Sequence, residues 1–385
     1  MKHKIIAVTS SRADYGILKP LLKKIEKDEA FDLVVVATGS HLDEKFGNTI
    51  TEIEKDNFAT VEKIPTHLTT TSANAINEAI GKLIAQFSNY YSTAKPDLVL
   101  VLGDRYEVFA AAIAAYVLQI PIAHIHGGEV SAGAFDEGFR HSITKLSALH
   151  FVICEEYQNR VIQLGENPKT VFNVGALVVD NIQQENLLSK EELEKFIGIS
   201  LASPSALITY HPVTLEKSTS LQHLQNLLEA LNHFPEMNLV FNKSNADTDG
   251  DVLNKALEAF VAKRDNAVLV DSLGMKKFLS TLKNVDMMIG NSSAGIIEMP
   301  YFKHPTINIG DRQKGRHKAA TVIDCGASFL DISKSIIKAR TNAFVKNAAK
   351  DPYPFGSGNS ANKIIELLKK NIPTINLKKS FHDLH

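Results

Sequence analysis

The sequence predicts an α/β protein built from two doubly wound, Rossmann-like domains. A strand–helix alternation runs through residues 4–174, stops near Gly175–Asn181, and starts again at about residue 206. The strands are short apolar runs rich in Val and Ile, as is typical of parallel strands buried on both faces. Polar or glycine-rich tips follow most of these strands. Because parallel strands end at one edge of a sheet, these tips should gather where such folds bind ligands.

Composition and charge restrict the classes of function. The chain has 385 residues, of which 44% are apolar and 22% charged, and a net charge of −1. A near-neutral charge argues against nucleic acid or an acidic membrane as the partner. The cysteines, Cys154 and Cys325, are far apart and form neither a disulfide framework nor a thiolate metal site. The first apolar run is too short for a signal peptide, and none spans a membrane, so we expect a cytoplasmic protein.

The first domain is expected to span residues 1–178. Its strands are placed at short apolar runs and its helices where apolar residues recur every three or four positions. The expected strands are residues 4–8, 33–37, 60–64, 98–102, 122–125, 150–153 and 170–174. Helices are expected after Asp14 and at about residues 70–94, 108–118, 136–146 and 155–163.

The second domain is expected to span residues 179–355. Its expected strands are residues 206–210, 239–241, 267–270, 287–289 and 306–309. Its expected helices are residues 221–231, about 250–262, 276–282 and 333–345, with another beginning after residue 290. A last segment, 356–385, carries a terminal helix that can cross back to the first domain. We expect the two domains to face a cleft, the usual place of a ligand site.

The densest group of ionisable side chains lies between His124 and His141. It includes Glu129, after an expected strand, and Asp136 and Glu137, at the start of an expected helix. A polar loop followed by a helix with ordinary i,i+4 pairs would also explain this composition. Asp104 follows the neighbouring strand, where it can cap a helix or act beside these carboxylates. Carboxylates that share a site push their pKa values apart, which separates an acid from a base.

Two strand-to-helix turns offer backbone N–H groups to an anion. In residues 9–14, Ser or Asp can cap the helix and Arg12 adds a positive charge. In residues 290–295, serine hydroxyls and N–H groups suit a pyrophosphate, with charge from the basic cluster at 312–316. Both turns can also be ordinary helix caps. Glu298, about one turn further on, suits a ribose diol better than a phosphate.

Histidines follow several of the expected strands. His211 follows the first strand of the second domain and precedes a proline, so we expect it to face the cleft. His41 follows the second strand, at the same edge as the other tips. His124 and His126, two positions apart, would share a face of a continuing strand. No third ligand stands at a fixed spacing, so no metal site is predicted.

Seven motifs occur in order along nearly the whole chain. They are Ser11-Arg-Ala-Asp-Tyr15, Gly103-Asp-Arg105, His126-Gly-Gly-Glu129, Arg140-His-Ser-Ile-Thr-Lys145, His211-Pro-Val-Thr214, Gly290-Asn-Ser-Ser293 and Gly310-Asp-Arg312. Together they resemble the hydrolysing UDP-N-acetylglucosamine 2-epimerases of sialic acid biosynthesis. Relatives that act on UDP-N,N'-diacetylbacillosamine in legionaminic acid synthesis share them. The motifs are specific for the family and do not choose between the two sugars.

The resemblance implies a fold and a reaction. The fold is GT-B-like, with no metal and no nicotinamide cofactor, and the partners are a UDP-sugar and further copies of the chain in a homodimer or homotetramer. UDP leaves by elimination across C1–C2 to give a glycal, to which water adds with inversion at C2. Such chemistry needs a base for the C2 proton, a group that stabilises the leaving group, and an acid/base pair for the hydration.

The resemblance also assigns roles to residues. It makes Asp104, Glu129 and either Asp136 or Glu137 the acid/base candidates, with His211 near the pyrophosphate. The predicted substrate-binding residues are Ser292, Ser293 and Arg312 for the diphosphate, Glu298 for the ribose, and Arg12, Asp14, Arg105 and Asn245 elsewhere around the substrate. His41 and His126, which end strands at the same edge, complete the predicted site.

The chain departs from the family pattern at His126. Other branches carry Glu there, so if that Glu is a catalytic base its role falls here to His126 or to Glu129. Two other classes of function stay open: a GT-B glycosyltransferase and a non-catalytic nucleotide-sugar sensor. The carboxylate-rich stretch 129–137 argues against the glycosyltransferase, since transfer needs fewer acid/base groups.

Overall fold

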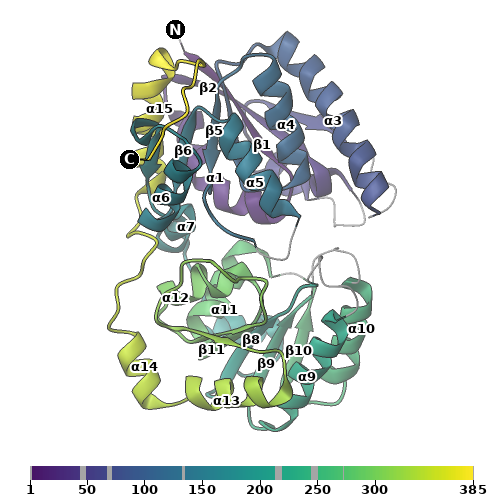
Figure 1. The fold of residues 1–385 in the computed structure, drawn as a ribbon. Helices are drawn as coiled ribbons and strands as arrows, with labels where there is room; N and C mark the ends of the chain where they lie inside the picture. Colours follow the sequence, from purple (N-terminus) through teal and green to yellow (C-terminus); the bar gives the residue numbers. More distant parts are fainter. Residues whose placement is uncertain are drawn as a thin grey trace. The chain divides into compact units, whose positions relative to one another are not determined.

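The computed structural model describes residues 2–43, 49–66, 72–131, 135–212, 219–243, 250–271 and 273–384. The chain forms two compact units (Figure 1). Unit 1 comprises residues 1–129, 136–181 and 355–385, and unit 2 comprises residues 130–135 and 182–354. Each unit holds one parallel sheet with helices along its faces, which confirms the predicted pair of doubly wound α/β domains.

Unit 1 contains a seven-stranded sheet in the order β3-β2-β1-β4-β5-β6-β7. Its strands are β1 (His3–Thr9), β2 (Phe31–Thr38), β3 (Val61–Ile64), β4 (Leu98–Leu102), β5 (Ile122–Ile125), β6 (Leu149–Val152) and β7 (Val171–Asn173). The chain order reverses between β1 and β4, the kind of switch point at which such sheets bind ligands.

The helices of unit 1 cover both faces of its sheet. They are α1 (Arg12–Lys27), α2 (Ile50–Lys55), α3 (Ala73–Ala94), α4 (Tyr106–Val117), α5 (Asp136–Leu146), α6 (Glu155–Gln163) and α15 (Ser360–Asn371), with short 3-10 turns at η1 (Gly39–Leu42), η3 (Pro168–Thr170) and η5 (Ile372–Thr374). The chain passes from unit 1 to unit 2 within α7 (Leu177–Gln184). One buried cluster lies under α1 and α15, and a second lies under α3, α4 and α5.

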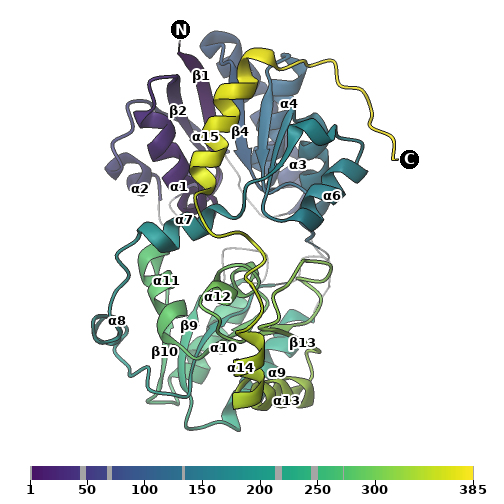
Figure 2. The same ribbon diagram turned by 90° about the vertical axis from the view of Figure 1, so that its left-hand side faces the viewer.

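The last helix packs against the first one. Figure 2 shows α15 and α1 on the same face of the unit 1 sheet. Leu18 and Leu22 of α1 and Ile364 and Leu368 of α15 belong to one buried core. At the rim of that core, Lys369 Nζ lies 2.6 Å from Asp28 Oδ2. The C-terminal segment therefore completes the hydrophobic core of unit 1.

Unit 2 contains a six-stranded sheet in the order β10-β9-β8-β11-β12-β13. Its strands are β8 (Ser205–Thr209), β9 (Asn238–Asn242), β10 (Ala267–Val270), β11 (Met287–Gly290), β12 (Thr306–Ile309) and β13 (Val322–Cys325). Its helices are α8 (Lys190–Ile197), α9 (Ser220–Asn232), α10 (Gly250–Val261), α11 (Gly274–Asn284), α12 (Glu298–Tyr301), α13 (Phe329–Ala339) and α14 (Asn342–Ala348), with a 3-10 turn at η4 (Ser293–Gly295).

Three local predictions for unit 2 were wrong. The short edge strand β13 was missed, because its alternating buried and exposed residues do not form an apolar run. The single helix expected over residues 333–345 is two helices, since Thr341 accepts a hydrogen bond from the Phe344 N–H at 3.2 Å and starts α14. After β11 the chain forms η4 and then α12, so Glu298 begins a short helix and does not lie one turn into a longer one.

No helix in the described ranges is both long and apolar enough to cross a membrane.

Gly290 fixes the end of β11. Its φ is +144°, and a Cβ at this position would stand 1.9 Å from the carbonyl oxygen of Thr209 on the paired strand β8. That oxygen belongs to the backbone of a central strand and cannot turn aside. Gly290 therefore lets β8 and β11 approach closely, and it sets the direction in which the chain leaves the sheet toward Ser292.

We expect Gly290→Ala to destabilise unit 2 by about 3 kcal/mol or more, the sum of overpacking and backbone strain. Gly274→Ala is the matched control, because Gly274 also has a positive φ but has open space around its Cβ position. It should cost only about 1 kcal/mol. Urea unfolding of both variants measures the difference. Equal stability of the two variants would show that β8 and β11 can separate without cost.

Candidate active site

The turn after β1 is held by its own side chains. Asp14 accepts hydrogen bonds from the Ser10 N–H at 3.0 Å, the Ser10 hydroxyl at 2.8 Å, the Ser11 N–H at 3.1 Å and the Thr9 hydroxyl. Ser11 Oγ in turn caps α1. Burial raises the pKa of Asp14, but the neighbouring His41 and these hydrogen bonds outweigh burial and lower it. Asp14 is thus an ionised cap that shapes the turn.

His41 and Arg12 flank this turn in different ways. His41 is fully buried, with Nε2 3.0 Å from Thr9 Oγ1 and Nδ1 2.8 Å from Thr49 Oγ1. Both of its ring nitrogens are therefore bonded inside unit 1. Arg12 is half-buried and makes no hydrogen bond or ion pair with any residue that the structure describes. Its guanidinium is the group at this turn that is open to an anionic ligand.

Arg105 is held by a residue that the sequence reasoning missed. Glu107, which is buried, accepts hydrogen bonds from Arg105 Nε at 3.2 Å and Nη2 at 3.1 Å. The Glu107 carboxylate raises the pKa of Arg105 above its already high value. Gly39 leaves the space for this pair, since a Cβ there would stand 2.6 Å from Glu107 Oε1. The sequence signal for Glu107 was that it is a lone carboxylate in the first turn of the alanine-rich helix α4.

Arg140 of α5 joins the predicted acid/base residues. It is buried, its Nη1 donates to the carbonyl oxygen of His126 at 2.9 Å, and its Nη2 is paired with the Asp104 carboxylate. Burial lowers the pKa of Arg140, but the surrounding carboxylates outweigh burial and raise it. Those carboxylates are Asp104, Glu129, Glu137 and Asp136. The sequence placed Arg140 in this stretch but did not give it a role.

Asp136 and Asp104 have different electrostatic surroundings. Burial and, after it, the negative charge of Asp104 raise the pKa of Asp136 to about 6. Asp104 has the Arg140 guanidinium as its direct partner. The raised pKa of Asp136 favours its protonated form, which suits a group that gives up a proton. Glu137, on the same turn as Asp136, has His141 Nε2 3.0 Å from its Oε1, so this helix contains an i,i+4 pair of the ordinary kind.

His126 and Glu129 form a close pair at the end of β5. Nδ1 of His126 lies 2.5 Å from Oε1 of Glu129, and the two residues are 6% and 2% exposed. His126 has a φ of +65°, which is strained for a residue with a side chain. Its other ring nitrogen, Nε2, is buried and has no hydrogen-bond partner within the described ranges.

His124 has a structural role. Its Nδ1 lies 3.1 Å from Thr144 Oγ1 and its Nε2 donates to the carbonyl oxygen of Gly103 at 2.8 Å. Burial lowers the pKa of His124 to about 3, so the ring is neutral. Among the residues that the structure describes, no three or more His, Cys, Asp or Glu side chains are grouped to hold a metal ion. Cys154 and Cys325 are free thiols.

In unit 2 the side chain of Asn291 connects β11 to the segment after β8. Its Oδ1 accepts from the His211 N–H at 2.7 Å and its Nδ2 donates to the His211 carbonyl oxygen at 2.7 Å. Burial and, after it, the charge of Arg312 lower the pKa of His211 to about 3. His211 is therefore a neutral imidazole that can hydrogen-bond an oxygen but carries no positive charge.

The Ser292 turn lies beside Arg312. Ser292 Oγ accepts from the Ala294 N–H at 3.3 Å, and Ser293 begins η4. The Asn291 carbonyl oxygen accepts from Arg312 Nη1 at 3.1 Å and from Gln313 Nε2 at 2.9 Å. Around Asn291 the structure thus brings together three predicted residues, His211, Ser292 and Arg312. The supporting residues Asn291 and Gln313 were not identified from the sequence.

Two other basic residues after β12 have partners other than Asn291. Lys314 is exposed, and its Nζ lies 3.5 Å from Asp311. Arg316 donates from Nε to the Val130 carbonyl oxygen at 2.7 Å and from Nη2 to Ser131 Oγ at 3.3 Å. Glu298 begins α12, and burial and, after it, the charge of Glu298 raise the pKa of the Tyr353 phenol. Asn245 lies outside the described residues.

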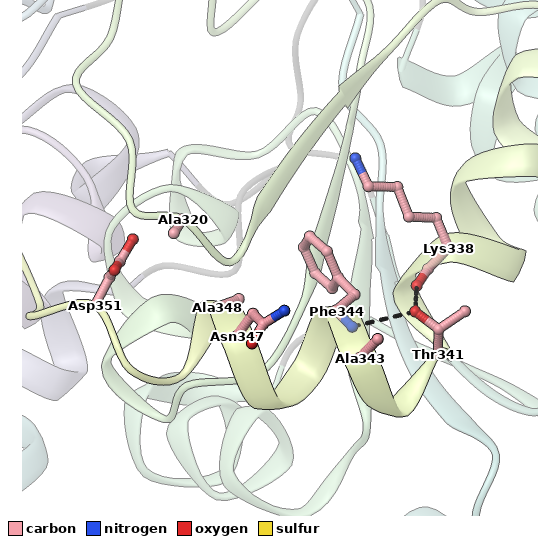
Figure 3. A pocket seen from close by; sticks show the side chains of 8 residues that line it. All are labelled: Ala320, Lys338, Thr341, Ala343, Phe344, Asn347, Ala348 and Asp351. Atoms are coloured by element: carbon pink, nitrogen blue, oxygen red, sulfur yellow. Dashed lines mark hydrogen bonds between the residues drawn. The ribbon is translucent and has the colours of Figure 1, made fainter.

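An open pocket on unit 2 involves none of these residues (Figure 3). It is lined by Ala320, Lys338, Thr341, Ala343, Phe344, Asn347, Ala348 and Asp351. In the close-up, the Thr341 hydroxyl donates to the Lys338 carbonyl oxygen at 2.8 Å and accepts from the Phe344 N–H. The pocket is thus a feature of the α13–α14 junction, and the predicted site is defined by side-chain chemistry at the strand ends.

The two doubly wound parallel-sheet domains give the chain a fold of the GT-B-like class. One domain carries a carboxylate cluster and the other a serine turn beside an arginine. The comparison with protein families narrows this class. The family model described as UDP-N-acetylglucosamine 2-epimerase matches residues 23–369. The chain belongs to this family, the hydrolysing UDP-N-acetylglucosamine and UDP-N,N'-diacetylbacillosamine 2-epimerases, and the resemblance seen in the sequence is confirmed.

Similar proteins cover the whole chain. It is 40% identical over all of its length to the GDP/UDP-N,N'-diacetylbacillosamine 2-epimerase (hydrolyzing) of Campylobacter jejuni, which is also fully covered. It is 38% identical to the polysialic acid biosynthesis protein P7 of Escherichia coli, with 99% of this chain and 97% of the relative covered. A Neisseria meningitidis UDP-GlcNAc 2-epimerase bound to UDP-GlcNAc has the same fold, with a TM-score of 0.81 at 20% identity over 96% of this chain and 100% of that one.

The raised pKa of Asp136 predicts a pH-dependent effect on stability. Because the folded state holds this proton more tightly than the unfolded state, stability falls as pH rises from the ordinary Asp value of 3.8 to about 6. Asp136→Asn removes this loss. We expect the variant to gain stability over wild type across this window and to keep the full gain above it.

Urea unfolding between pH 4 and pH 8 measures this gain. Since the Asp104 charge is one of its causes, the gain should be smaller when Asp136→Asn is made in an Asp104→Asn background. A gain that does not depend on pH would contradict the assignment of a raised pKa to Asp136.

Proposed function

We propose that the protein converts UDP-N-acetylglucosamine to N-acetylmannosamine and UDP, for sialic acid synthesis. The observation that supports this most strongly is the group of four carboxylates around the buried guanidinium of Arg140, of which Glu129 is itself buried. Elimination and hydration across C1–C2 move several protons, and a binding module has no need of so many acid/base groups around one guanidinium. A glycosyltransferase of the same fold has less use for them as well.

In this proposal unit 1 handles the protons. The acid/base candidates are Asp104, Glu129, Asp136 and Glu137. The positive charge of Arg140 offsets the repulsion between these carboxylates. Asp136, with its raised pKa, is the group best suited to give up a proton, and Asp104 is held by the Arg140 guanidinium. Arg12, Arg105 and the turn shaped by Asp14 bind the substrate at the same sheet edge, with His41 as the support of that turn.

Unit 2 binds the nucleotide in this proposal. Arg312 and the hydroxyls and N–H groups of Ser292 and Ser293 bind the diphosphate. His211, neutral and next to Arg312, donates a hydrogen bond to a phosphate oxygen and so helps UDP to leave. Glu298 accepts hydrogen bonds from the ribose hydroxyls, and Asn245 is a further substrate contact. No metal or cofactor is required, and we propose a cytoplasmic homodimer or homotetramer.

A second substrate deserves a direct test. The relative from Campylobacter jejuni, 40% identical over the full length, is named for UDP-N,N'-diacetylbacillosamine. This sugar differs from N-acetylglucosamine at C4 and C6 and is the same at C1 and C2, where the proposed chemistry takes place. The acid/base cluster therefore suits both sugars, and the alternative is the same reaction in legionaminic acid synthesis.

The experiment is incubation of the purified protein with each UDP-sugar alone. We expect UDP release together with a free sugar of inverted C2 configuration, identified by NMR, and faster turnover of UDP-N-acetylglucosamine. Faster turnover of the diacetylbacillosamine substrate would establish the alternative. Dependence on an added acceptor would contradict epimerisation in favour of glycosyl transfer, and binding without turnover would indicate a sensor.

We expect Arg312→Ala to weaken UDP binding by about 10-fold to 100-fold, the loss of a charge-assisted hydrogen bond. Lys314→Ala is the matched control, because Lys314 is a cation two residues away that is exposed and paired with Asp311. Its affinity for UDP should stay within about threefold of wild type. Calorimetric titration with UDP compares them. An equal loss of UDP affinity in both variants would mean that Arg312 contributes only its positive charge and makes no direct contact with UDP.

A further inference from the structure

One buried histidine in unit 1 has the geometry of a catalytic base. His126 Nδ1 lies 2.5 Å from Glu129 Oε1, while His126 Nε2 is buried and lacks a hydrogen-bond partner in the part of the chain that the structure describes. A buried nitrogen left without a hydrogen bond destabilises the folded state. His126 follows the end of β5, and the Arg140 guanidinium contacts both its carbonyl oxygen and Asp104. An unpartnered nitrogen at such a strand end indicates a position that a ligand atom completes.

The pairing with Glu129 sets the chemistry of the ring. A carboxylate oxygen only accepts hydrogen bonds, so Nδ1 carries the hydrogen of the short contact. In the neutral ring, Nε2 then has a free lone pair and can accept a proton. The carboxylate also stabilises the imidazolium that forms when it does, as in other His–carboxylate pairs.

The segment that carries the pair is held firmly. Arg140 Nη1 donates to the His126 carbonyl oxygen at 2.9 Å, and Arg160 Nη1 donates to the Gly128 carbonyl oxygen at 2.6 Å. A Cβ on Gly128 would stand 2.5 Å from the carbonyl oxygen of Tyr157, so the backbone lies directly against α6. His126 itself is held at a φ of +65°, a strained conformation that persists when its surroundings enforce it.

The other buried histidines of unit 1 have different surroundings. His41 and His124 each use both ring nitrogens for internal hydrogen bonds. His150 has a similar arrangement, with Nε2 3.0 Å from the buried Glu166 and Nδ1 buried without a partner among the described residues, but it lies inside β6 and not after the strand end. Glu166 is shared with Lys145 and Lys379, each at 2.6 Å, so that cluster binds the C-terminal segment to the unit. His126 is the one that lies beside the acid/base carboxylates.

We propose that Nε2 of His126 is the base that removes the C2 proton of the sugar, with Glu129 as its positioning partner. This inference rests on the proposed function. The electron pair of the C2–H bond forms the C1=C2 double bond, the C1–O bond to the diphosphate breaks, and UDP leaves with its electron pair. The proton stays on Nε2 and later passes to solvent. Asp136 then protonates C2 from the other face, while water adds at C1 and returns a proton to Asp136.

The test is His126→Asn. Asparagine tolerates a positive φ, and its amide can still donate to Glu129 in place of Nδ1, but it has no atom equivalent to Nε2. We expect turnover to fall by about 10²-fold to 10⁴-fold, the usual contribution of a general base, with KM and melting temperature close to wild type. His233→Asn, the same change at an exposed histidine of unit 2, should leave turnover unchanged.

Glu129→Gln separates the two members of the pair. Glutamine keeps an oxygen that accepts from Nδ1, so its turnover should exceed that of His126→Asn. A greater loss in Glu129→Gln would make Glu129 the base and overturn the proposal. UDP release at the wild-type rate with accumulation of a glycal in His126→Asn would also overturn it, since His126 would then act in the second step.

The activity of the wild-type protein distinguishes a failure of the proposed function from a failure of the His126 assignment. If wild type releases no UDP from either UDP-sugar, the proposed function fails, whatever the variants do. If wild type is active and His126→Asn retains more than about a tenth of that activity, the loss is smaller than the loss expected for a general base. In that case the assignment of His126 fails and the proposed function stands.

Discussion

The buried guanidinium of Arg140 is the constraint on which the site in unit 1 depends. It pairs with Asp104, holds the carbonyl oxygen of His126, and lies within the field of Glu129, Asp136 and Glu137. Breaking a buried pair of this kind typically costs about 3–5 kcal/mol, because a charge is left without compensation. One side chain on α5 therefore fixes the ends of β4 and β5 and permits four carboxylates to lie close together.

The same site carries unfavourable features that a purely structural loop has no reason to keep. His126 has a left-handed backbone conformation, its Nε2 is buried without a partner among the described residues, and Asp136 has a raised pKa. Each lowers the stability of the folded state, and each is useful for moving protons. Strain concentrated at one strand end, inside a well-packed parallel sheet, is what a catalytic role predicts. Asp14 and Glu107, in contrast, are fully satisfied and hold the neighbouring segments in place.

Much of the fold could be predicted because parallel strands here are apolar runs followed by polar tips. Every expected strand is present, and the topology brings the tips to one edge in each sheet. Partners could not be predicted in the same way. That Arg140 reaches Asp104, 36 positions away, or that Asn291 binds both polar backbone groups of His211, depends on three-dimensional packing and not on local pattern. The sequence prediction missed strand β13 and the break between α13 and α14 for a local reason. A half-exposed edge strand and a threonine cap leave only weak signals in the sequence.

If this cluster carries out the epimerisation, it exchanges the proton at C2 of a UDP-sugar. Turnover of UDP-N-acetylglucosamine in D₂O, with the free sugar analysed by NMR, measures this exchange. We expect deuterium at C2 in every product molecule, because the proton that leaves one face is not the one that returns to the other. A product of inverted configuration that retains its original C2 proton would rule out exchange by this cluster.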